Sequence, residues 1–100
     1  MLGDETYRAV CAQVIRLLRE ERERRKLSKY LVAQKSGLSQ QMIAYVERGT
    51  KKPSLETVLR IAEALEVDLG AVLKQARKEI IRSDVRRTRD GVPKAARLKT

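Results

Sequence analysis

The sequence predicts an all-α domain of five helices. Apolar residues recur at the three- and four-residue spacing of a helix along most of the chain, and cap or turn residues interrupt that pattern between consecutive helices. A chain of 100 residues, 42% of them hydrophobic, is long enough to bury one small core. The core is expected to be aliphatic, because the chain has no Phe, no Trp and only three Tyr.

The centre of the chain, residues 31–49, predicts two short helices joined by a tight turn. Gly37 stands where the first of these helices must end, because only a residue without Cβ adopts a positive φ at low cost. Ser39 is suited to cap the second helix, which is expected over residues 40–47. The residues expected to form one buried stripe per helix are Leu31, Val32 and Ala33 before the turn, and Ile43 and Val46 after it.

Helical patterns continue on both sides of this centre. Residues 4–26 predict a long first helix with the apolar residues Val10, Cys11, Val14, Ile15, Leu17 and Leu18. Ser28 is expected to cap the second helix and Ser54 to begin the fourth. The predicted buried stripe of the fourth helix is Leu55, Val58, Leu59, Ala62 and Leu65. Asp68 is expected to cap a fifth helix with the apolar positions Leu69, Val72, Leu73, Ala76 and Ile80.

Charge is distributed unevenly along the chain. Twenty-three Lys and Arg against 13 Asp and Glu give a net charge of +10, so a polyanionic partner is expected. Residues 19–26 are all charged and predict a solvated helix end held by the ion pairs Arg19–Glu23, Glu20–Arg24 and Glu21–Arg25. Glu47 stands among basic residues and is expected to turn back, pairing with Arg48 or with a neighbouring helix. Residues 82–100 carry seven basic and two acidic side chains and predict a basic C-terminal tail.

Three segments stand at separations that fit one another: AQKSGLSQQ at residues 33–41, IAYVERG at 43–49 and PSLETVLRIAEAL at 53–65. Together they resemble the lambda-repressor/Cro-like (XRE) helix-turn-helix family over residues 14–73. The resemblance implies a five-helix lambda-repressor-like DNA-binding domain, here with extended first and last helices. Residues 1–81 are therefore expected to form the DNA-binding domain, and residues 82–100 a basic extension or tail.

The third helix is expected to lie in the major groove of DNA. The residues placed to reach base edges are Gln40, Gln41, Ala44 and Tyr45. A Gln offers adenine a donor and an acceptor, an Ala touches a thymine methyl, and a Tyr hydroxyl reaches a base or a phosphate. The residues expected to contact the DNA backbone, mostly by carry-over from the family, are Ser28, Lys29, Ser39, Arg48, Lys51 and Lys52. The family very often has Gln where Lys29 stands; a Lys binds phosphate but does not brace a recognition-helix Gln in the same way.

Two features lie outside the predicted recognition surface. The lone Cys11 cannot form an intramolecular disulfide and is expected to be a small core or interface residue. Ile80 and Ile81 require a burial partner beyond the compact unit. That partner is expected to be either the start of the first helix, at Tyr7, Val10 and Cys11, or the same extension in a second subunit.

These features predict a cytoplasmic, sequence-specific transcriptional regulator, in the simplest case a repressor. Double-stranded DNA is the expected partner, and a homodimer is expected to bind a palindromic operator with half-sites about 34 Å apart. No membrane interaction is expected, because no apolar run approaches the length of a membrane span. An enzyme, a cofactor and a metal are not expected, because the chain has no His, no thiol beside a base and no Gly-rich phosphate-binding loop.

Two alternatives stay open at this point. An antitoxin would use the same domain and bind a toxin through the charged first helix or the tail. An RNA- or ribosome-associated adaptor would bind chiefly through the basic tail, so that deletion of residues 86–100 would abolish its nucleic-acid binding. No segment of the sequence predicts a pocket for a small-molecule effector.

Overall fold

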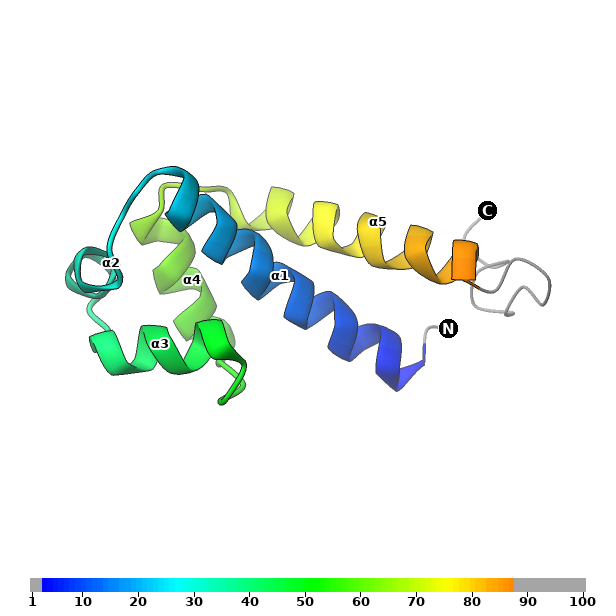
Figure 1. Cartoon of the computed structure of the whole chain (residues 1–100), viewed down its shortest axis with the longest axis horizontal. Helices are drawn as coiled ribbons and strands as arrows, with labels where there is room; N and C mark the ends of the chain where they lie inside the picture. The colour runs from blue at the N-terminus through cyan, green and yellow to red at the C-terminus, as the bar shows by residue number, and fades with distance from the viewer. Residues whose placement is uncertain (1–2, 88–100) are drawn as a thin grey trace.

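The computed structural model describes residues 3–87, with side chains described as far as Ser83, and it contains five helices in this part of the chain. They are α1 (Asp4–Arg24), α2 (Lys29–Ser36), α3 (Gln40–Arg48), α4 (Leu55–Ala64) and α5 (Leu69–Arg87). The three short helices α2, α3 and α4 gather at one end of the long pair α1 and α5 (Figure 1). Residues 3–87 form no strand, which confirms the predicted all-α fold.

Side-chain caps begin four of the helices at the predicted residues. The hydroxyl oxygens of Ser28, Ser39 and Ser54 each accept a hydrogen bond from the backbone N–H three residues later. Each cap satisfies one of the backbone donors that the first turn of a helix leaves free. At the start of α5, the carboxylate of Asp68 accepts from the backbone N–H of Gly70 at 2.9 Å. The predicted N-caps are therefore confirmed.

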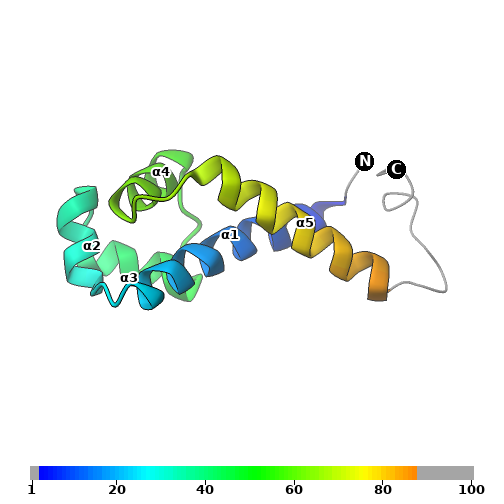
Figure 2. The ribbon, with the colours of Figure 1, turned by 90° about the horizontal axis from the view of Figure 1, so that it is seen from above.

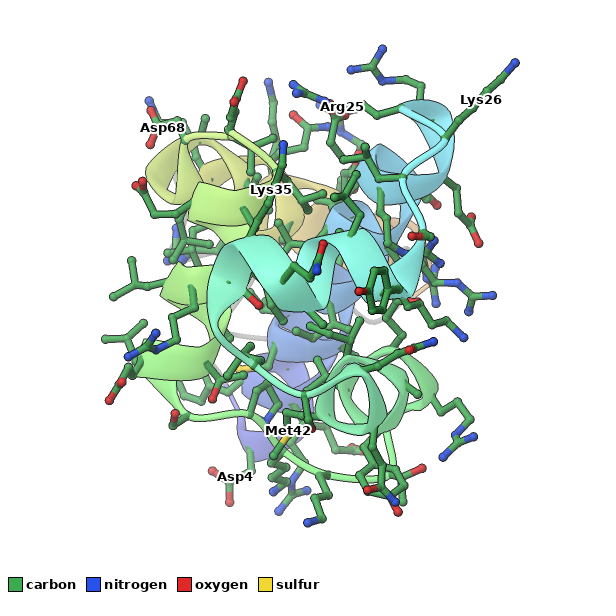
Figure 3. The ribbon with its side chains drawn as sticks, turned by 90° about the vertical axis from the view of Figure 1, so that its left-hand side faces the viewer. Asp4, Arg25, Lys26, Lys35, Met42 and Asp68 are labelled. Atoms are coloured by element: carbon green, nitrogen blue, oxygen red, sulfur yellow. The ribbon has the colours of Figure 1, made fainter. Side chains whose placement is uncertain are left out.

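The C-terminal ends of α1 and α4 could not be predicted from cap residues, because each is followed by a non-glycine residue in the left-handed conformation. α1 ends at Arg24, two residues before the predicted end of the first helical stretch, because Lys26 adopts a left-handed φ of 58°. The backbone N–H groups of Lys26 and Leu27 donate to the carbonyls of Glu23 and Arg22, which closes the helix end. α4 ends with the same pattern at Glu66, whose φ is 59°. Lys26 stands at the corner between α1 and α2, and its side chain projects away from the ribbon (Figure 3).

The core is aliphatic, as the composition predicts. The largest fully buried side chains are those of Ile43, Leu65, Val32 and Val46. Val10, Val14 and Leu18 of α1 and Ala33 of α2 join them, so the predicted stripe of α3 is confirmed and those of α1 and α2 are confirmed in part, because Leu31 is only half-buried. α1 and α3 are amphipathic, and the face of each that lies opposite its buried stripe is solvated.

Three predictions of burial were wrong. Leu55 and Leu59 of α4 are 68% and 45% exposed, and α4 instead buries Ile61 and Ala64 beside Ala62 and Leu65. Leu73 of α5 is 43% exposed, because the helix is covered along only a narrow stripe centred on Ala76. Cys11 is exposed on α1, which excludes the core role and leaves the interface role as a prediction.

α1 and α5 lie side by side and run in opposite directions (Figures 1 and 2). Gln13 of α1 donates a hydrogen bond of 2.7 Å to Glu79 of α5, and Gln75 donates to the same carboxylate. These two bonds lower the pKa of the Glu79 carboxyl. Ile80 packs against the core of the same chain, so part of the apolar surface of the extension is buried within the subunit.

Helix α5 continues to Arg87, past the predicted domain boundary at residue 81. Residues 88–100, most of the predicted basic tail, lie outside the described part of the chain, so the division at residue 81 stays a prediction. None of the helices that residues 3–87 form has both the length and the hydropathy needed to cross a membrane.

We expect Lys26→Gly and Glu66→Gly each to raise the free energy of unfolding by about 0.5–1 kcal/mol. The steric cost of a left-handed residue with a Cβ exceeds the additional chain entropy that a glycine loses on folding. Urea titration measures the change. Gly49→Ala is the opposite control. Gly49 has a φ of 76°, and a Cβ at this position would have no atom within 4 Å, so only backbone strain is added. The free energy of unfolding of this variant should therefore fall by a similar amount. Unchanged stability in both Gly variants would contradict this explanation of the helix ends.

Candidate nucleic-acid interface

The turn between α2 and α3 is fixed by backbone and side-chain contacts. Gly37 has a φ of 77°, as its position predicts. The hydroxyl of the buried Ser36 donates to the carbonyl of Ala33 and accepts from the N–H of Leu38. From α4, Arg60 donates to the carbonyl oxygen of Ser36 at 3.1 Å. The turn is therefore held from both sides, and this sets the angle at which α3 leaves α2.

Helix α3 has one buried face and one accessible face. Ile43 and Val46 are 1% and 2% exposed and hold α3 on the core. Gln40 and Gln41 are exposed, and Ala44 and Tyr45 are half-buried. The four predicted base-contacting residues are thus accessible or partly accessible on α3. Their contact with DNA stays a prediction.

Tyr45 is the centre of a small cluster on the surface of α3. Gln41 Nε2 donates to the Tyr45 hydroxyl at 2.6 Å. The Arg48 guanidinium lies 5.4 Å from the centroid of the Tyr45 ring, and Lys51 Nζ lies 5.3 Å from it. Both distances are within the range of a cation–π interaction. The ring therefore holds one predicted base-contacting side chain and two predicted backbone-contacting side chains in place.

The other predicted backbone-contacting residues lie at helix starts and in the loop after α3. Ser28 and Ser39 are exposed N-caps, and Lys29 is the half-buried first residue of α2. Lys52 is exposed in the loop between α3 and α4. The structure therefore brings Arg48 and Lys51 together at Tyr45, and it places Ser28 and Lys29 at the other helix of the turn.

Glu47 pairs with Arg22 of α1, which confirms that it turns back to a neighbouring helix. Arg22 Nε lies 2.7 Å from one Glu47 oxygen, and Arg22 Nη2 lies 3.0 Å from the other. Arg22 Nη1 also donates to the carbonyl of Leu27 at 2.8 Å. The two side chains are only 12% and 10% exposed, and the hydrogen bonds to Glu47 raise the pKa of Arg22. This pair ties the end of α3 to α1 and to the turn before α2.

The other predicted ion pairs agree with the structure in two cases out of three. Arg19 pairs with Glu23, and Arg25 pairs with Glu21. Arg24 also pairs with Glu21, and not with the predicted Glu20. The two arginines hold the pKa of the Glu21 carboxyl at about 2.

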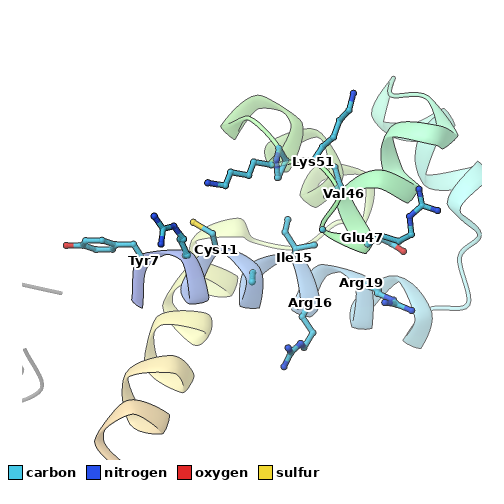
Figure 4. Close-up of a pocket in the computed structure, with 14 residues that line it drawn as sticks. Tyr7, Cys11, Ile15, Arg16, Arg19, Val46, Glu47 and Lys51 are labelled. Carbon is cyan, nitrogen blue, oxygen red and sulfur yellow. The ribbon is translucent and has the colours of Figure 1, made fainter. Parts of the chain in front are cut away.

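A groove of about 630 Å³ opens between α1 and the end of α3, and the sequence did not predict it. We call it the α1–loop groove (Figure 4). It is lined by Tyr7, Arg8, Cys11, Ala12, Ile15, Arg16 and Arg19 of α1, and by Val46, Glu47, Arg48, Gly49, Lys51, Lys52 and Pro53. Cys11 and Ile15 rise from α1 toward the loop that carries Lys51 (Figure 4). Nothing in the sequence pattern signals this groove, because its two walls are more than 25 residues apart.

Within residues 3–87, no three acidic or Cys side chains are grouped so that they could hold a metal ion. The charged side chains that line the groove are cations except for Glu47, and the α3 surface carries amide and hydroxyl groups that can donate and accept, so both suit an anionic or hydrogen-bonding partner.

A model of the helix-turn-helix family matches residues 18–72. The chain belongs to the lambda-repressor/Cro-like (XRE) helix-turn-helix family. The matched residues begin near the end of α1 and include α2, α3, α4 and the start of α5. The first four turns of α1 and the C-terminal part of α5 extend beyond the match.

Three curated relatives of this helix-turn-helix chain are named uncharacterized HTH-type transcriptional regulators. One, from Sinorhizobium fredii, is 38% identical over 52 residues, which are 52% of this chain and 26% of the relative. Two from Mycobacterium tuberculosis strains are 36% identical over 59 residues, which are 59% of this chain and 42% of each relative. The match thus spans between a quarter and a half of the relatives' length. No solved structure matches the chain.

We expect Arg22→Ala to lower the free energy of unfolding by roughly 3 kcal/mol, because it leaves the largely buried Glu47 carboxylate without its partner. Arg19→Ala is the control, since Arg19 and Glu23 are both about half exposed and such pairs contribute at most about 1 kcal/mol. Urea titration measures both losses. In the double variant Arg22→Met/Glu47→Leu most of the stability should return. Equal losses in Arg22→Ala and Arg19→Ala would show that the Arg22–Glu47 pair does not anchor α3.

Proposed function

We propose that this chain is a sequence-specific DNA-binding transcriptional regulator that inserts α3 into the major groove. The observation that carries the proposal is the accessible polar face of α3, with Gln40 and Gln41 exposed above the buried Ile43 and Val46. The family, the names of the relatives and the net charge of +10 support the same function. The second helix of a helix-turn-helix commonly reads base edges through its N-terminal residues.

Gln41 is prepared to read an adenine. Its Nε2 carries two hydrogens, and one of them is donated to the Tyr45 hydroxyl. The second hydrogen and the Oε1 acceptor remain for the N7 and N6 groups of adenine. Because the hydrogen bond to Tyr45 restricts the rotamers of Gln41 before binding, less side-chain entropy is lost when the base contact forms.

The basic residues around α3 supply affinity that does not depend on sequence. Arg48, Lys51 and Lys52 at the end of α3, with Ser28, Lys29 and Ser39 at the helix starts, contact the phosphate backbone in this proposal. Each neutralised phosphate releases counterions, so binding weakens as salt increases. Phosphate contacts set the register of α3 on the duplex, and the Gln side chains distinguish the bases.

The regulator acts by equilibrium binding and performs no catalysis in this proposal. A homodimer binds a palindromic operator whose half-sites are about one helical turn apart, near 34 Å. Two identical half-sites match the two-fold symmetry of the dimer. A dimer bound at a promoter blocks access of the polymerase, which makes repression the simplest outcome. Selection of bound sequences from a random DNA pool tests the proposal directly: a palindromic motif is expected, and the absence of any enriched motif would contradict it.

We expect Gln41→Ala to weaken binding to the selected site by ~1–3 kcal/mol and to leave binding to random DNA nearly unchanged. Lys51→Ala should weaken both and reduce the slope of log affinity against log salt by about one unit. Fluorescence anisotropy titrations at several salt concentrations measure these quantities. Gln34→Ala is the matched control, because Gln34 donates to Tyr30 on α2 as Gln41 does to Tyr45 on α3. If Gln41→Ala and Lys51→Ala gave the same losses on both DNAs, the assigned roles would be wrong.

Tyr45→Phe should reduce discrimination at the base that Gln41 reads by about 1 kcal/mol, because it removes the hydrogen bond that holds Gln41. The Phe ring keeps the cation–π contacts with Arg48 and Lys51, so binding to random DNA should change little. Tyr30→Phe on α2 removes the equivalent bond to Gln34 and serves as the control. Competition with operators substituted at single positions measures the change, and uniform weakening at all positions would contradict the role given to the hydroxyl.

A further inference from the structure

The α1–loop groove carries more positive charge than the proposed backbone contacts account for. Its cationic lining residues are Arg8, Arg16, Arg19, Arg48, Lys51 and Lys52. The one carboxylate that lines it is that of Glu47, which is already engaged by Arg22. No described carboxylate lies within ion-pair distance of Arg8 or Arg16, and Arg19 has only its half-exposed pair with Glu23. The groove therefore attracts anions.

The cations stand on two opposite margins of the groove. Arg48, Lys51 and Lys52 belong to the end of α3 and the loop after it. Arg8, Arg16 and Arg19 belong to α1, and the Arg16 side chain extends from the side of that helix opposite the loop that carries Lys51 (Figure 4). Between the margins the lining is apolar, from Cys11, Ala12, Ile15, Val46 and Pro53. An occupant must therefore be anionic and must also offer apolar surface.

We propose that the α1–loop groove seats a further stretch of DNA backbone, with Arg8, Arg16 and Arg19 as additional phosphate contacts. This inference rests on the proposed function. A nucleic-acid strand has the required chemistry, because its phosphates are anionic and the C–H faces of its sugars pack on apolar side chains. The groove is also continuous with the proposed backbone contacts, since Arg48, Lys51 and Lys52 line it.

The length of the α1 margin fits this occupant. Arg8 and Arg19 are eleven residues apart on one helix, which corresponds to about 16 Å along its axis. One strand of DNA carries one phosphate per nucleotide, and neighbouring phosphates lie farther apart along the strand than the 3.4 Å rise of the duplex axis, so about two or three phosphates pass along that distance. Arg8 and Arg16 lie outside the region that the family model matches. The early turns of α1 thus give this chain a wider footprint on DNA than the matched domain alone provides.

The salt dependence of binding tests the inference. Replacing Arg8 and Arg16 with Ala should reduce the slope of log affinity against log salt by nearly two units, at about 0.9 for each lost phosphate contact. Lys74→Ala/Lys78→Ala is the matched control, because it removes two exposed charges of α5 that do not line the groove. Both double variants are measured on the selected operator and on random DNA. An equal slope change in the two double variants would overturn the inference, because it would report only the net charge.

Cys11 provides an independent measurement, since it is the only cysteine of the chain and lies exposed in the groove. Saturating operator DNA should slow alkylation of Cys11 by iodoacetamide at least several-fold. In the control variant Cys11→Ser/Lys78→Cys, the thiol on α5 should react at the same rate with and without DNA.

The two proposals fail in different ways. If Gln41→Ala and Lys51→Ala behave as expected while Cys11 alkylates at the same rate with DNA bound, the proposed function stands and the groove is not a DNA contact. If no variant distinguishes operator from random DNA, the proposed function itself fails. Protection of Cys11 together with an unchanged slope in Arg8→Ala/Arg16→Ala would also overturn the inference, because the groove would then be covered by something other than phosphate.

Discussion

The ion pair between Arg22 and Glu47 holds together the parts of this protein that matter for DNA binding. It joins the end of α3 to α1, and Arg22 also donates to the carbonyl of Leu27 in the turn before α2. One guanidinium, a planar and rigid group, therefore joins three segments through three hydrogen bonds. Because both side chains are about nine-tenths buried, loss of either partner leaves an uncompensated buried charge, and the pair removes a carboxylate from a surface that otherwise attracts anions. The position of α3 on the core, and the wall of the α1–loop groove, both depend on it.

Tyr45 holds neighbouring side chains in place on the accessible face of α3, as Arg22 does on the buried side. Its hydroxyl accepts from Gln41, and its ring lies close to Arg48 and Lys51. The side chain proposed to read a base and two side chains proposed to hold phosphates are therefore ordered by one residue. If these proposed roles hold, the side chains that give sequence preference and those that give general affinity are positioned before DNA binds, and less entropy is lost on binding.

The long helices extend this compact recognition unit. α1 and α5 pack along each other beyond the matched helix-turn-helix region, and the hydrogen bond from Gln13 to Glu79 crosses between them. The packing of α5 on α1 keeps the early turns of α1 in a defined place. Those turns carry Arg8, Cys11 and Arg16, which form one margin of the α1–loop groove. A helix that would be solvated on its own thereby becomes a candidate contact surface.

The sequence by itself determined the features that arise within a few residues. Ser28, Ser39 and Ser54 each cap a helix through a bond that spans three residues, and Gly37 ends α2 because its backbone adopts a φ of 77°. The faces of α3 also follow from local spacing, since Ile43 and Val46 lie on one side of the helix and the Gln residues on another. These local signals were sufficient to predict the five helices and the two faces of α3.

Only the tertiary structure decided what depends on contacts between distant residues. Arg22, the partner of Glu47, stands 25 positions away in the sequence. The sequence pattern could therefore predict a partner on a neighbouring helix but could not identify Arg22. Lys26 ends α1 in a left-handed conformation that its residue type disfavours, because the packing of α2 on the core fixes the path of the chain there. The apolar residues of α4 cover more than one face, so their spacing could not decide which face is buried. The helices around α4 bury Ile61 and Ala64 and leave Leu55 and Leu59 exposed. The α1–loop groove exists only because folding places the start of α1 beside the end of α3.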